Sequence, residues 1–103
     1  MELGTEMDAL AIAGSALQAQ QINLGIIADN IANSETPGYQ PQQARFISTS
    51  PGVAVGAIIG SPQSGSDIGG QLVDLLFARL AYEAAAKVAG TSQQMTQSLL
   101  QSI

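Results

Sequence analysis

A seven-residue repeat of leucine and isoleucine runs through the first third of the chain. It places large aliphatic side chains at Leu3, Leu10, Leu17, Leu24 and Ile31. No proline occurs between residues 5 and 33, and an unbroken seven-residue apolar repeat is typical of a coiled-coil helix. We therefore predict one helix over residues 5–33, roughly 43 Å long at about 1.5 Å per residue.

A second apolar stripe lies beside this repeat at helical spacing. Its members are Ile12, Ala16, Ala19, Ile22 and Ile26. One partner helix covers only the first and fourth positions of a heptad, so it cannot cover both stripes. The width of the apolar surface therefore predicts that this helix contacts two or more neighbours.

The first helix is expected to end in a turn around Pro37. Proline disfavours helical geometry at the residue before it, and Pro37 followed by Gly38 suits the central positions of a type II turn. Asn30 and Asn33 face one side of the last helical turn, where their amides either cap free carbonyl groups or bind a neighbouring subunit; capping is the favoured role. The residues assigned to the helix stop and turn are Asn30, Asn33, Thr36, Pro37, Gly38 and Tyr39.

The rest of the chain predicts a long connection and a second helix. Residues 34–69 are rich in Pro, Gly and Ser and are expected to form a loop, in which Val53 to Ile59 could be a strand. A helix over residues 70–102, with Asp67 as a candidate cap, follows from the apolar spacing. Its length matches the first helix. We therefore predict an all-α fold, a single helical domain over residues 1–103 with two long helices in an antiparallel coiled-coil-like hairpin.

Composition argues against most catalytic and ligand-binding roles. The chain has no cysteine and no histidine, which removes thiol nucleophiles, imidazole bases and the commonest zinc ligands. We expect no catalytic residues, no metal, no cofactor and no small-molecule substrate. A net charge of −5 is the wrong sign for nucleic acid, and no apolar run reaches the roughly 20 residues needed for membrane insertion.

The charged residues of the second helix form a ladder at every fourth position, Arg79, Glu83 and Lys87. Pairs at this spacing are typical of a solvated helix face, and we favour that interpretation. No Lys or Arg precedes Arg45, so the start of the chain lacks the positive region of a cleavable signal peptide. Any export is expected to use another route.

The segment Asn30-Ile-Ala-Asn-Ser-Glu-Thr-Pro-Gly-Tyr39 resembles the signature of bacterial flagellar axial proteins, in which an Asn-Ile-Ala-Asn helix end runs into a Thr-Pro-Gly-Tyr turn. Near the other end, Leu80 to Val88, followed by Met95 and Leu99, resembles the C-terminal helix of the same family. The connection between the helices is unusually short, so the resemblance is to the proximal-rod type of flagellar basal-body rod protein.

This resemblance implies a structural, non-enzymatic subunit of the periplasmic rod that serves motility, self-assembles through its terminal helices and is exported uncleaved by the flagellar type III pathway. Its partners would be itself, as a homo-oligomer, and other flagellar axial proteins. The alternative is a soluble helical adaptor or export-associated binding module that does not polymerise. The residues expected at the assembly interface are Leu10, Leu17, Ile22, Leu24, Ile26, Ile31, Phe77, Leu80, Tyr82, Val88, Met95 and Leu99.

Overall fold

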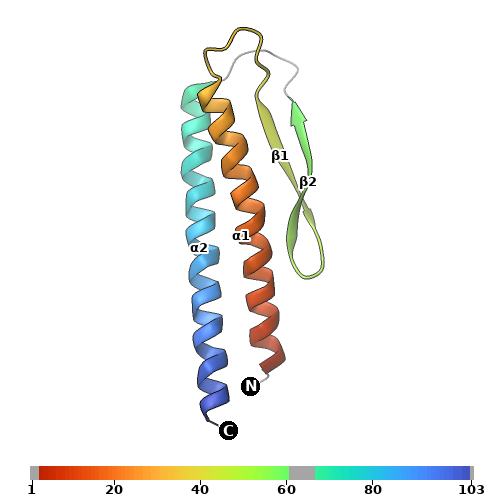
Figure 1. The fold of residues 1–103 in the computed structure, drawn as a ribbon, viewed down its shortest axis with the longest axis vertical. Coiled ribbons are helices and arrows are strands. Elements are labelled where there is room, and N and C mark those ends of the chain that lie inside the picture. Colours follow the sequence, from red (N-terminus) through yellow and green to blue (C-terminus); the bar gives the residue numbers. More distant parts are fainter. Residues whose placement is uncertain (1–2, 61–66, 103) are drawn as a thin grey trace.

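The computed structural model describes residues 3–60 and 67–102 and contains two long helices and a β-hairpin (Figure 1). Helix α1 spans Leu3–Ala32 and helix α2 spans Ile68–Gln101. Strands β1, Gln42–Ser48, and β2, Val53–Gly60, lie between them in sequence. The helices therefore begin and end within about two residues of their predicted bounds.

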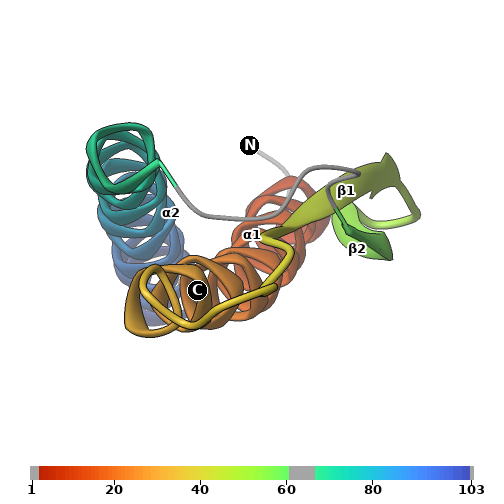
Figure 2. The same cartoon turned by 90° about the horizontal axis from the view of Figure 1, so that it is seen from above.

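Helix α1 is the central element of the fold. Figures 1 and 2 show α2 along one side of α1 and the hairpin along the other. The two helices run antiparallel, as predicted, with the N- and C-termini at the same end of the molecule. The Cα atoms extend over 62 × 22 × 13 Å, so the chain forms one long layer that leaves much of each helix uncovered.

The prediction of an all-α fold is wrong, because residues 42–60 form a two-stranded antiparallel sheet. The stretch from Val53 to Ile59 does form a strand, β2. Its pairing partner, β1, lies in what was predicted to be loop. The register shifts between Arg45 and Phe46, where Gly56 is the extra residue of a bulge on β2. Residues 61–66, another part of the predicted loop, lie outside the described residues.

The buried core is thin and is made mostly of small side chains. Its apolar members are Ala13, Ala19, Ile26, Ile27 and Ala78. Alanine lets the two helices approach closely, but each buried alanine removes little apolar area from water. Asp67 occupies the N-cap position of α2, although its side chain makes no capping hydrogen bond. Within the described residues, neither helix has the length and hydropathy of a membrane span.

Candidate functional site

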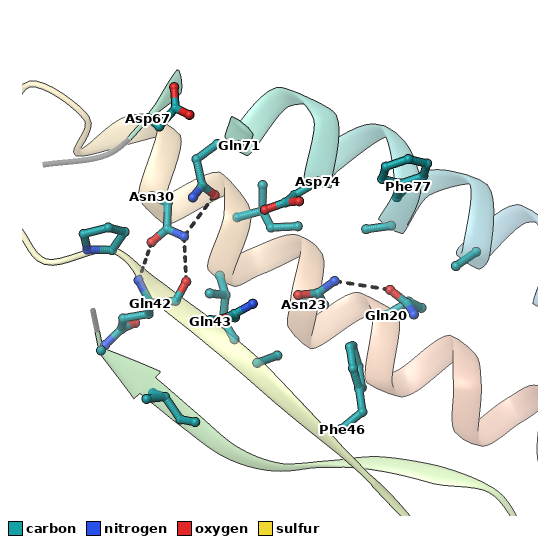
Figure 3. Close-up of a pocket in the computed structure, with 18 residues that line it drawn as sticks. Gln20, Asn23, Asn30, Gln42, Gln43, Phe46, Asp67, Gln71, Asp74 and Phe77 are labelled. Atoms are coloured by element: carbon teal, nitrogen blue, oxygen red, sulfur yellow. Dashed lines mark hydrogen bonds between the residues drawn. The ribbon is translucent and has the colours of Figure 1, made fainter. Parts of the chain in front are cut away.

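Asn30 of α1 is bonded to the turn, to β1 and to α2, and only 1% of its surface is exposed. Its Nδ2 donates to the backbone oxygen of Gln42 at 2.7 Å and to Oε1 of Gln71 at 3.1 Å. Its Oδ1 accepts from the Gln42 backbone N–H and from the Tyr39 hydroxyl, both at 2.8 Å. The amide thus pairs with β1 much as a neighbouring strand would, and it also bonds to the start of α2 (Figure 3). Through Tyr39 it holds the turn as well.

The turn that follows α1 has the predicted geometry. Nδ2 of Asn33 donates to the carbonyl of Asp29 at 2.9 Å, so Asn33 caps its own helix as expected, whereas Nδ2 of Asn30 donates to Gln42 and Gln71. The Tyr39 N–H donates to the carbonyl of Thr36, and Gly38 has φ 75°. These are the features of a type II turn with Pro37 and Gly38 at its centre, which returns the chain along α1.

The tip of the β-hairpin is fixed to α1 at Ser15. The Ser15 hydroxyl donates to the carbonyl of Ile12 at 2.7 Å and accepts from the Val53 N–H at 3.1 Å. Ser15 and Asn30 are separated by roughly 22 Å of helix, which matches the roughly 23 Å of a seven-residue strand. The hairpin is therefore attached to α1 at both of its ends.

Gly52 allows this contact, because a Cβ at this position would overlap Ser15 Oγ and lie 3.4 Å from the Cα of Ile12. We expect Gly52→Ala to lift the hairpin tip and break the bond between Ser15 and Val53, at about 1 to 1.5 kcal/mol. Hydrogen exchange of the Val53 amide should accelerate roughly tenfold. Gly60→Ala is the matched control, since its Cβ would meet nothing within 4 Å. Equal protection in both variants would contradict a fixed hairpin tip.

A groove of about 780 Å³ runs between α2 and β1, with α1 as its floor (Figure 3). Amide and carboxylate side chains line much of it, including Asn23 on α1 and Asp74 on α2, while Phe46 and Phe77 enter from opposite sides. Further along the helices lies a second depression of about 320 Å³, which we call the notch. The notch is lined only by apolar residues, which are Ala9, Ile12, Ala13, Ala16, Ala85 and Val88.

The first three turns of α2 carry a continuous apolar surface that the rest of the described chain does not cover. We call it the α2 apolar face; its members are Ile68, Leu72, Val73, Leu76, Phe77 and Leu80. Each is between 42% and 64% exposed. The predicted assembly interface includes Phe77 and Leu80 of this face but neither Leu72 nor Leu76. An apolar patch of this kind on a single chain is typical of an interaction site.

The predicted interface residues fall into three groups. The exposed ones are Ile22, Phe77, Leu80, Val88 and Met95. The half-buried ones are Leu10, Leu17, Leu24, Ile31, Tyr82 and Leu99. Ile26 forms the third group, because it is only 7% exposed and lies in the groove with Phe46 and Ile59 of the hairpin. Ile26 is therefore covered by the chain's own hairpin, and its place at an assembly interface stays a prediction.

The charged groups form one ion pair in the part of the chain that the structure describes. Arg79 Nε lies 3.1 Å from Glu83 Oε1, and both side chains are largely exposed. A pair of this kind on a solvated helix contributes a few tenths of a kcal/mol at most, as the sequence spacing suggested. Over the same residues, no group of three or more acidic side chains is placed to hold a metal ion.

Asn30 and the turn that follows α1 lie within the segment that matches known proteins. Residues 10–40 match the family model described as flagella basal body rod protein. The flagellar basal-body rod protein FlgG of Agrobacterium fabrum is 55% identical over 40 residues, and FlgG of Caulobacter vibrioides is 48% identical over the same length. In each case the match covers 39% of this chain and 15% of the relative.

These matches confirm the predicted resemblance to flagellar rod proteins for the N-terminal part of the chain. They include the α1 heptad from Leu10 onward, Asn30 and the turn through Tyr39. The resemblance of Leu80 to Val88 lies beyond the residues of the family model and stays a prediction. Ser15 and Asn30, which fix the hairpin, both fall within the matched segment.

Proposed function

Since residues 10–40 carry the segment characteristic of flagella basal body rod proteins, we propose that this chain is a structural subunit of the flagellar basal-body rod. The family match is the observation that carries the proposal. The matched segment amounts to 15% of each FlgG relative. A role and partners like those of the whole FlgG proteins are therefore a proposal for this chain. The rod family is structural, which supports a non-enzymatic role.

The proposed mechanism is lateral assembly through the helices. A layer only 13 Å thick in Cα extent cannot enclose its own apolar side chains, and the α2 apolar face remains open to contact. Packing of this face against other helical subunits would remove the exposed apolar area from water. The partners proposed are further copies of this chain and other axial proteins of the flagellum, with the periplasmic rod as the location. Uncleaved export by the type III pathway remains an expectation from the resemblance.

Assembly is tested by comparing two glutamine substitutions on α2. Leu76→Gln changes an exposed leucine of the α2 apolar face, 54% exposed, and Ala86→Gln changes an exposed alanine outside that face. We expect both variants to retain the helical circular dichroism spectrum. Leu76→Gln should weaken self-association at least tenfold, because it removes about 1.5 to 3 kcal/mol of apolar burial at the interface, whereas Ala86→Gln should not.

Sedimentation velocity over a range of concentrations measures this difference. The wild-type chain is expected to form larger species as concentration rises, alone or with purified rod proteins of the same organism. A chain that stays monomeric at high concentration and is not recruited by other axial subunits would contradict the rod proposal. That result would favour the adaptor that does not polymerise.

A further inference from the structure

The two ends of the β-hairpin are held to α1 very unequally. At the open end, where β1 begins, Asn30 is bonded to both the N–H and the oxygen of Gln42 and to the Tyr39 hydroxyl. The turn after α1 also ties this end to the helix covalently. Among the described residues, the tip makes a single hydrogen bond to α1, from the Val53 N–H to the Ser15 hydroxyl at 3.1 Å. The tip is therefore the weaker attachment.

The hairpin interrupts the second apolar stripe of α1. Ala19 lies one helical turn after Ser15 on the same side of α1, between the two attachment points, and it is buried. Ile12 and Ile22 of the same stripe are nearly half exposed. If the tip moves away from α1, the stripe becomes continuous from Ile12 through Ala19 to Ile22.

We propose that the hairpin is a strap that lifts from α1 at its tip, turns about its open end and so controls access to the second apolar stripe. Lifting breaks one hydrogen bond between neutral groups, and water replaces it at both Ser15 and Val53. Release of the open end would break two bonds to Gln42 at once and disturb the buried amide of Asn30, so that end acts as the hinge.

The strap has its own internal bonding and can turn without coming apart. Its strands are joined through seven residue pairs, none of which involves α1. At the tip, the Thr49 N–H donates to the carbonyl of Gly52 at 2.7 Å. Segments with few contacts to the rest of a fold are the ones that open first. This movement concerns the single chain, and only its consequence for assembly rests on the proposed function.

Two amides report the two attachments separately, because each donates to a side chain of α1. The Val53 N–H reports the tip, and the Gln42 N–H reports the open end. In the monomeric wild-type chain we expect hydrogen exchange of Val53, corrected for intrinsic rates, to be at least tenfold faster than that of Gln42. Thr49, whose N–H is bonded within the hairpin, should also exchange more slowly than Val53.

A disulfide can lock the tip, since the chain has no native cysteine. A Cβ at Gly52 would lie 3.3 Å from the Cβ of Ser15, close to the roughly 3.5 to 4.5 Å of a disulfide. The double variant Ser15→Cys, Gly52→Cys is oxidised at low concentration, and mass spectrometry checks that the bond lies within one chain. When reduced, the same variant has a crowded tip without the Ser15 bond and represents the lifted state.

The two forms of this double variant test whether lifting controls assembly. We expect the oxidised form to assemble with a dissociation constant at least tenfold larger than that of the reduced form, as measured by sedimentation velocity. Both forms should keep the helical circular dichroism spectrum, and added reductant should restore assembly of the oxidised form.

The outcomes separate the strap from the proposed function. Equal exchange at Val53 and Gln42 would overturn a hinge at the open end, and exchange of Thr49 as fast as that of Val53 would indicate a tip that unravels. An oxidised double variant that assembles as well as its reduced form would overturn control of the stripe. A wild-type chain that does not assemble, alone or with axial proteins, would overturn the proposed function, while the exchange rates of the monomer would still decide whether the tip lifts.

Discussion

Asn30→Ala is expected to lower the free energy of unfolding by about 2 to 3 kcal/mol, because the side chain is hydrogen-bonded to Gln42 of β1, to Tyr39 of the turn and to Gln71 of α2. Its removal leaves the backbone N–H and oxygen of Gln42 without their helix partner. The half-buried Tyr39 hydroxyl and the Gln71 side chain also lose an acceptor and a donor. The open end of the hairpin should then separate from α1.

Chemical denaturation followed by circular dichroism measures this loss at a concentration low enough to keep the chain monomeric. Asn33→Ala is the matched control, since Asn33 is also an amide in the last turn of α1 but bonds only within its own turn, to Asp29 and Thr36. The control should cost about 0.5 kcal/mol. Equal losses of unfolding free energy in the two variants would show that the Asn30 side chain does not hold the hairpin in solution.

A double-mutant cycle identifies the bond between Asn30 and Tyr39. Tyr39→Phe removes only the hydroxyl that donates to Asn30 Oδ1 at 2.8 Å, and it should cost about 1 kcal/mol in the wild-type chain. In the Asn30→Ala background the same change should cost close to nothing. A coupling energy near zero would contradict the observed bond.

The sequence predicted the helices and the turn because both depend on local chemistry. The heptad repeat and the absence of proline define α1, and the pair Pro37 and Gly38 defines the type II turn. These signals lie within a few residues of the structure they specify. The ion pair between Arg79 and Glu83 is local in the same sense.

The β-hairpin could not be predicted in the same way, because it depends on contacts with residues far away in the sequence. A two-stranded hairpin is at best marginally stable by itself in water. Its attachments in this chain come from Asn30, twelve residues before Gln42, and from Ser15, thirty-eight residues before Val53. Neither Asn30 nor Ser15 differs locally from an ordinary polar residue on a helix, so nothing in its own segment predicts the long-range bond.

The assembly surfaces illustrate a related limit. The two apolar stripes of α1 correctly indicated more than one neighbour, but the sequence did not show that one neighbour is the chain's own hairpin. Ala19 and Ile26 are buried within the chain, whereas Ile12 and Ile22 of the same stripe are nearly half exposed. The pattern of apolar residues therefore predicted the width of the contact surface, and only the fold separates its internal part from its external part.

That separation gives the second large effect, a comparison of Ile26→Asn with Ile22→Asn. The two positions lie one helical turn apart on α1, and the change in helix propensity is the same at each. Ile26 is 7% exposed and Ile22 is 47% exposed. We expect Ile26→Asn to lower the free energy of unfolding by about 4 kcal/mol, because it removes a buried aliphatic side chain and buries an amide that has no hydrogen-bond partner.

A loss of about 4 kcal/mol is a large part of the roughly 5 to 15 kcal/mol that stabilises a typical domain, so Ile26→Asn should be substantially unfolded by circular dichroism at 37 °C. Ile22→Asn should change the stability of the monomer by about 0.5 kcal/mol or less and act only on assembly, as sedimentation velocity would show. The contact between the hairpin and α1 predicts this order. If Ile26→Asn were as stable as Ile22→Asn, the hairpin would not cover Ile26 in solution, and both isoleucines would belong to the external surface of α1.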